Sequence, residues 1–172
     1  DFKRNIHDYL FGVAHRINFD DKFNKHLMYW LMELKKTDDP LYWHLADTVA
    51  TVLRRDCLSS PSSVNACEKE KRQIVLKLVS EVSDCTTNEC HEKALQVLRN
   101  IPLPTSYRYA KQQLCRTNSS FAVQTAALQL IERVSPSFYD SELVGLLMRL
   151  IRNACPHPTS TGEAQLAADI LV

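Results

Sequence analysis

The sequence predicts an all-α protein built from short amphipathic helices. Apolar residues recur every three or four positions along nearly the whole 172-residue chain, and no window of comparable length shows the period of two expected of a half-buried strand. The chain has only 3 glycines, although hairpin turns and phosphate-binding loops both need glycine. An all-β fold, a P-loop and a dinucleotide-binding fold are therefore disfavoured.

Successive apolar stripes at helical spacing each predict one helix. Each stripe is long enough for about three or four turns and gives its helix one apolar face, so each helix needs packed neighbours to be stable. The stripes cover residues 6–17, 23–34, 41–53, 74–82, 94–101, 107–114, 123–134, 143–151 and 164–171.

Helix starts and chain breaks stand between these stripes. Asp39 and Ser135 each precede a proline, and such a pair places a good N-cap before a proline at the first helical position. Proline-containing or polar segments between the stripes predict loops and turns. These breaks are expected at residues 59–63, 102–104, 117–120 and 156–158.

Stacked helical hairpins are the architecture that best suits such helices, because each pair buries its apolar stripe against the next pair. The repeat has no fixed consensus, and a compact helical bundle is the alternative. No shift in composition marks a domain boundary, so residues 1–172 are expected to form a single helical domain or a fragment of a larger protein. The start at Asp1 in place of methionine and the uncapped apolar end favour a fragment.

Charge and hydropathy exclude two classes of partner. Lys and Arg number 21 against 20 Asp and Glu, a net charge of +1. A domain that binds nucleic acid usually carries a basic excess, so no nucleic-acid partner is expected. No segment reaches the ~20 apolar residues that span a bilayer.

Between about Leu41 and the end of the chain, packing motifs follow one another at residues 41–57, 84–85, 94–104, 114–115, 123–133, 141–153 and 163–172. In the order and spacing of these motifs, the chain resembles the large lipid transfer protein family, which includes apolipoprotein B, apolipophorin, vitellogenin and the microsomal triglyceride transfer protein. One departure is Arg99, which stands where the family usually has glycine before Asn100. The spacing around Cys85 and Cys115 is most similar to the apolipoprotein B and apolipophorin branch.

The resemblance implies a right-handed superhelix of stacked antiparallel hairpins that supports a lipid cavity or a lipoprotein particle. Lipid would be bound through the rest of the parent protein, and a partner subunit or a receptor would be the protein partner. The implied setting is secretion or the lumen of the endoplasmic reticulum, with no enzymatic activity and no cofactor. The alternative is a HEAT-like scaffold for protein–protein interaction in the cytosol.

Six cysteines favour disulfides in an oxidising compartment. Their number is even, and four of them stand in polar, loop-like segments where buried thiols are not expected. The family resemblance implies a bridge between Cys85 and Cys115, at two predicted helix ends about 30 residues apart. Cys90 is the alternative partner of Cys85.

The remaining cysteines are assigned by position and by elimination. Cys57 and Cys67 flank the Ser/Pro-rich loop and are expected to close it. Cys90 and Cys155 are then left as the third pair. Because six cysteines allow many connectivities, this assignment is a hypothesis.

Two chemical roles compete with disulfides in this region. Cys85, Cys90 and His91 offer the thiolates and imidazole that zinc prefers, but their spacing matches no common zinc finger. Cys90 and His91 are neighbours at a helix start, so their side chains point apart and do not form a nucleophile–base pair. No metal site and no catalytic residue is therefore expected.

Two further features concern the surface of the protein. Asn118 begins the chain's one glycosylation sequon, Asn118-Ser119-Ser120, in a polar loop where a sugar would fit. Tyr29 and Trp30 are residue types that favour interfaces, but Trp30 lies on an apolar stripe and is expected in the core.

Overall fold

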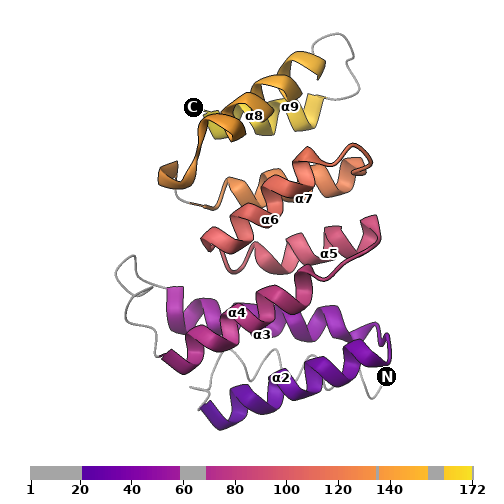
Figure 1. The fold of residues 1–172 in the computed structure, drawn as a ribbon, viewed down its shortest axis with the longest axis vertical. Coiled ribbons are helices and arrows are strands. Elements are labelled where there is room, and N and C mark those ends of the chain that lie inside the picture. Colours follow the sequence, from indigo (N-terminus) through magenta and orange to yellow (C-terminus); the bar gives the residue numbers. More distant parts are fainter. Residues whose placement is uncertain (1–20, 59–68, 135, 155–160, 172) are drawn as a thin grey trace. The chain divides into compact units, whose positions relative to one another are not determined.

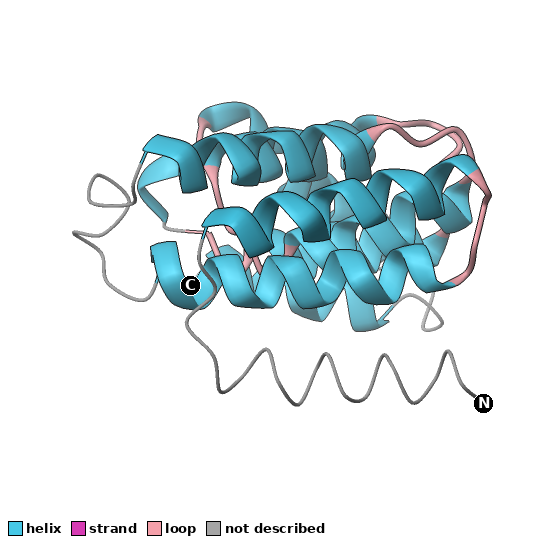
Figure 2. Ribbon diagram, turned by 90° about the horizontal axis from the view of Figure 1, so that it is seen from below, coloured by secondary structure: helices cyan, strands magenta, loops and turns pink. Residues whose placement is uncertain are grey.

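The described residues of the computed structural model are 21–58, 69–134, 136–154 and 161–171. They form helices and contain no strand, which confirms the all-α prediction (Figures 1 and 2). The α-helices are α2 (Asp21–Lys36), α3 (Leu41–Leu58), α4 (Lys69–Ser83), α5 (Asn88–Leu98), α6 (Pro104–Cys115), α7 (Phe121–Ile131), α8 (Ser141–Ala154) and α9 (Thr161–Leu171). A 3₁₀ turn, η1, spans Pro136–Phe138.

Every predicted stripe from residue 23 onward lies on one of these helices, and the stripe at residues 6–17 lies outside the described part of the chain. Two stripes end beyond their helices. Ile101 and Val134 follow the last residues of α5 and α7, yet their exposed fractions are 0% and 2%. The apolar pattern therefore reports burial correctly at both positions, although the turns after α5 and α7 are not α-helical.

The helix starts follow local hydrogen-bonding chemistry. The Asp39 carboxylate accepts from the Leu41 backbone N–H at 3.0 Å, and Pro104 is in the first turn of α6. The predicted start at Ser135-Pro136 is wrong in one respect, because Pro136 begins the 3₁₀ turn and not an α-helix. Asp140 accepts from the Leu143 N–H at 2.8 Å and caps α8 instead.

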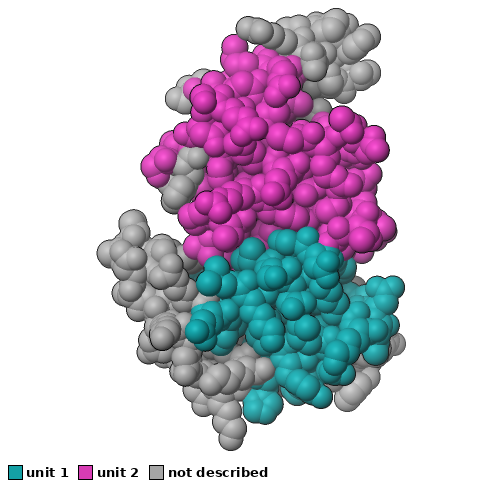
Figure 3. All heavy atoms as spheres, viewed as in Figure 1, with its two compact units in different colours: residues 1–84 teal, residues 85–172 magenta. Residues whose placement is uncertain are grey.

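The chain divides into two compact units, residues 1–84 and residues 85–172 (Figure 3). In unit 1, each of the helices α2, α3 and α4 contacts the other two. Among the described side chains of this unit, the fully buried leucines are Leu31, Leu53 and Leu78, one from each helix. Lys35 joins α2 to the end of α4, donating to the Glu81 carbonyl at 2.8 Å and pairing with the carboxylates of Glu81 and Asp84.

Unit 2 is built from α5 to α9. Helices that pack closely there are one or two positions apart in chain order: α5 contacts α6 and α7, α6 contacts α7 and α8, and α9 contacts α7 and α8. Six of its described leucines have no exposed surface, and they come from α5, α7 and α8. They are Leu95, Leu98, Leu128, Leu130, Leu143 and Leu147. The core of this unit is therefore formed by side chains buried between helices that are close together along the chain.

No helix within the described ranges combines the length and the apolar character needed to cross a membrane.

Candidate functional site

A disulfide joins Cys85 to Cys90 at the start of α5. Thr87 is the N-cap of this helix, and its hydroxyl accepts from the Cys90 backbone N–H at 3.2 Å. The cap folds the segment back on itself, so that the two cysteine Cα atoms lie 5.5 Å apart, within the usual range for a disulfide. The chain sequence therefore creates the bridge locally, through one turn and one capping residue.

This pairing corrects the connectivity implied by the family resemblance. Cys85 is bonded to Cys90, so neither the Cys85–Cys115 bridge nor the Cys90–Cys155 pair is present. Cys115, the last residue of α6, is exposed and carries a free thiol. Cys90, the alternative partner of Cys85 in the sequence analysis, is thus the partner found in the structure.

The predicted Cys57–Cys67 pair lies outside the side chains that the structure describes. Cys57 falls in α3, but its side chain is not among the described ones, and Cys67 and Cys155 lie outside the described residues. A Cys57–Cys67 bridge therefore stays a prediction.

The zinc alternative does not agree with this geometry. A disulfide leaves neither Cys85 nor Cys90 a thiolate to bind metal. Across the described part of the chain, no group of three or more His, Cys, Asp or Glu side chains is placed to hold a metal ion.

His91 and Tyr109 form a buried polar pair beside the disulfide. The Nδ1 atom of His91 and the Tyr109 hydroxyl are 2.7 Å apart, and their exposed fractions are 6% and 8%. Burial lowers the pKa of His91 from 6.5, with a further contribution from the positive charge of Arg116, and raises the pKa of Tyr109 to about 12. Both rings are therefore neutral at pH 7, which suits a structural hydrogen bond between α5 and α6.

The predicted glycosylation loop lies in unit 2, between α6 and α7. Asn118 is exposed, and its carbonyl oxygen accepts from the Asn88 side chain at 3.2 Å. Ser120 is the N-cap of α7 and accepts from the Val123 N–H at 3.3 Å. The loop is held at both ends while Asn118 faces solvent, and its glycosylation stays a prediction.

A separate cluster of charges joins α6 to the start of α8. Lys111 donates to the Asp140 carboxylate at 2.7 Å and also pairs with Glu142. The two carboxylates raise the pKa of Lys111, and Lys111 lowers the pKa of Asp140. Since Asp140 also caps α8, this one carboxylate fixes both the start of the helix and its contact with α6.

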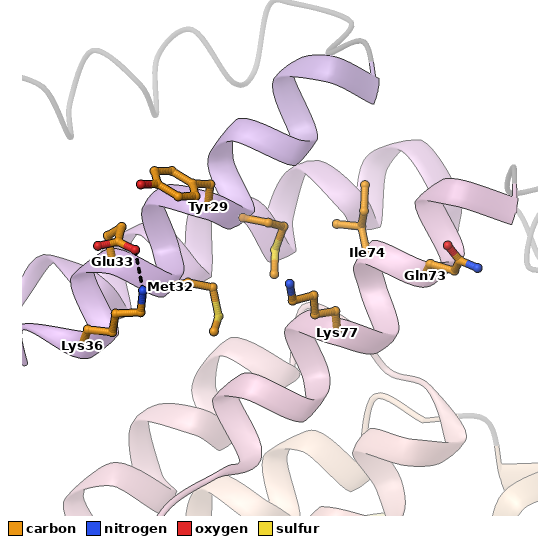
Figure 4. A pocket seen from close by; sticks show the side chains of 8 residues that line it. Tyr29, Met32, Glu33, Lys36, Gln73, Ile74 and Lys77 are labelled. Atoms are coloured by element: carbon orange, nitrogen blue, oxygen red, sulfur yellow. Dashed lines mark hydrogen bonds and ion pairs between the residues drawn. The ribbon is translucent and has the colours of Figure 1, made fainter.

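Unit 1 contains a pocket of about 520 Å³ between α2 and α4 (Figure 4). Its walls mix apolar and charged side chains, and the Glu33 carboxylate pairs with Lys36 at 2.7 Å on the α2 side. The lining residues are Met28, Tyr29, Met32, Glu33 and Lys36 from α2, and Gln73, Ile74 and Lys77 from α4.

The sequence reasoning missed this pocket. Met28, Met32 and Lys36 do recur every four residues, so they share one face of a helix, but nothing in the sequence shows that α4 faces them. Trp30 is a related error. It was predicted to be in the core, yet it is 48% exposed and Tyr29 is 62% exposed, because Leu27, Met28 and Leu31 form the buried face of α2.

Comparison with known proteins finds a relative that covers nearly the whole chain. A microsomal triglyceride transfer protein homolog from Caenorhabditis elegans is 41% identical to this chain over 167 residues, 97% of the chain. This identity supports membership of the large lipid transfer protein family. It spans 18% of the length of that relative. No family profile matches the chain, and no solved structure matches it.

The structure explains one departure from the pattern of the large lipid transfer protein family. Arg99, at the position where glycine is usual, is the C-cap of α5 with φ −58° and ψ −25°. This is right-handed helical backbone, which any side chain adopts without strain. The relative is named for triglyceride transfer, whereas the cysteine spacing is most similar to the apolipoprotein B and apolipophorin branch.

Proposed function

We propose that this chain is part of the helical scaffold of a secreted or luminal lipid-transport protein. The observation that carries the proposal is its 41% identity, over nearly its whole length, to a microsomal triglyceride transfer protein homolog. In this proposal the rest of the parent protein holds the lipid, and the helices support its cavity or particle. A partner subunit or a receptor would bind the same scaffold.

The proposed architecture is a right-handed superhelix of antiparallel hairpins. The packing within unit 2 supports this architecture. Among its described residues, each closely packed pair of helices is one or two positions apart along the chain. A compact bundle would bring its first and last helices together as well. Neighbour-only burial is typical of stacked hairpins, in which each pair covers the next.

The proposed compartment is supported by the Cys85–Cys90 disulfide. Cytosolic proteins are kept reduced and rarely contain structural disulfides, whereas luminal and secreted proteins commonly do. This argues against the cytosolic HEAT-like scaffold. A supporting role without catalysis also agrees with the relative, which is named for transferring a lipid and not for a covalent reaction.

A triglyceride transfer assay tests the scaffold role. We expect the full-length parent protein to move labelled triglyceride between vesicles, and the 172-residue chain alone to move none. Leu128→Asp, at a fully buried position of α7, should abolish transfer by the parent because a buried unpaired charge disrupts the core.

The matched control is Val144→Asp, at a residue of α8 that is 41% exposed, which should leave transfer close to normal. Transfer by the isolated chain at the rate of the parent would place the lipid site within these helices and contradict the proposal.

A further inference from the structure

The pocket between α2 and α4 has an apolar floor. Met28 is 5% exposed and Ile74 is 9% exposed, so both are fixed in the core of unit 1 while they line the pocket. Met32 is half-buried beside them. Methionine side chains are unbranched, flexible and polarisable, and they adapt well to apolar ligands of variable shape.

The rim of this pocket is positively charged. Its charged groups are Glu33, Lys36 and Lys77, and the Glu33 carboxylate neutralises Lys36. Lys77 is exposed, and no described side chain forms an ion pair or a hydrogen bond with it. Figure 4 shows Lys77 extending from α4 into the space between the two helices, opposite the Glu33–Lys36 pair. One uncompensated ammonium group therefore lies next to an apolar floor.

The size of the pocket suits a small ligand. Its volume of about 520 Å³ falls within the roughly 300–1,000 Å³ that is typical of small-molecule sites. An apolar floor with a single positive charge at the edge is complementary to an alkyl chain that ends in an anion. An uncharged lipid would leave the Lys77 ammonium without an ionic partner, and an inorganic anion would leave the methionine side chains exposed to solvent.

We propose that this pocket binds a single-chain anionic amphiphile, a fatty-acid carboxylate, with its alkyl chain on Met28, Met32 and Ile74 and its carboxylate at Lys77. The site is additional to the lipid that the parent protein is proposed to carry. It does not depend on that function, because every residue in it belongs to unit 1.

Calorimetric titration of the 172-residue chain with sodium dodecanoate, below the concentration at which micelles form, tests the proposal. We expect saturable binding at one site. Octanoate should bind at least about 10-fold more weakly, because each buried methylene strengthens binding by up to about 4-fold. Butyrate and dodecyltrimethylammonium should not bind measurably, since the first lacks the chain and the second carries the wrong charge.

Two variants locate the binding. Lys77→Gln should weaken dodecanoate binding by roughly 3- to 5-fold, as expected for an exposed ion pair. Met32→Ser should also weaken dodecanoate binding, because it removes an apolar contact with the alkyl chain. The matched control is Lys93→Gln, an exposed lysine on α5 that pairs with Glu89 and should leave the affinity unchanged. Circular dichroism of each variant establishes that its helices are intact.

Several results would overturn the proposal. One is a lack of dodecanoate binding, and another is equal binding of dodecanoate and dodecyltrimethylammonium. The third is an equal affinity for dodecanoate in the Lys77→Gln variant and the unsubstituted 172-residue chain. None of these results bears on triglyceride transfer by the full-length protein. The proposed scaffold role and the proposed fatty-acid site can therefore be refuted independently.

Discussion

At the scale of single residues, the burial of His91 makes the stability of unit 2 depend on pH. The folded protein lowers the pKa of His91 below its usual value of 6.5, so the unfolded chain binds the proton more tightly. The stabilisation is complete above about pH 6.5 and is lost as the pH falls through the lowered pKa of the folded state. Urea unfolding measured from pH 8 to pH 5 should show stability decreasing toward acid.

Substitution separates the effect of the proton from that of packing. His91→Phe should remove its part of the pH dependence and lower the unfolding free energy at pH 7.5 by about 1–3 kcal/mol, because it leaves the Tyr109 hydroxyl buried without a partner. The double variant His91→Phe/Tyr109→Phe should recover most of that loss. If the single variant keeps the full pH slope, another group causes it.

The disulfide shows why the sequence alone did not determine the site. The composition shows the six cysteines and favours an oxidising compartment, but the choice between Cys90 and Cys115 as the partner of Cys85 depends on the turn at Thr87. A bridge this short is worth roughly 2 kcal/mol in the chain-entropy model, against roughly 3–4 kcal/mol for one closing about 30 residues. Local geometry, not the larger entropic gain, selects the bond.

At the scale of elements, Ser120 both caps α7 and completes the glycosylation sequon of Asn118. The two roles separate by substitution. Ser120→Ala should lower the unfolding free energy of unglycosylated protein by about 1 kcal/mol, whereas Ser120→Asp should be close to neutral because aspartate is an equally good N-cap. Chemical denaturation of protein made in bacteria measures both.

The control is Asn118→Gln, which removes the sequon and keeps the cap, and which should not change the stability of the same unglycosylated material. An equal loss of stability in Ser120→Ala and Ser120→Asp would mean that the hydroxyl does not act as a cap.

The helices themselves were predictable because burial on one face imposes a period of 3.6 residues, and every described stripe became a helix. Their ends were less predictable. Ser135-Pro136 and Asp140 are both good signals for a helix start. Asp140 also pairs with Lys111, which lies on a helix 29 residues earlier in the chain, and the local sequence does not show this contact. The pocket was not predictable, since its two walls come from α2 and α4, which are not consecutive.

At the scale of the whole molecule, the redox state of the cysteines connects the structure to the proposed compartment. We expect protein from its natural source, digested without reduction and analysed by mass spectrometry, to contain a Cys85–Cys90 linkage and a reduced Cys115. The loop between Cys57 and Cys67 should also be closed.

The same digest reports the sugar on Asn118, because treatment with a glycosidase that converts the glycosylated asparagine to aspartate marks it by mass. A linked Cys85–Cys90 pair together with an occupied Asn118 requires passage through an oxidising, glycosylating compartment, in keeping with a secreted or luminal member of the large lipid transfer protein family. Six reduced thiols and an unmodified Asn118 would contradict that setting and favour the cytosolic scaffold. A Cys85–Cys115 linkage would keep the compartment but show that the turn at Thr87 does not determine the partner of Cys85.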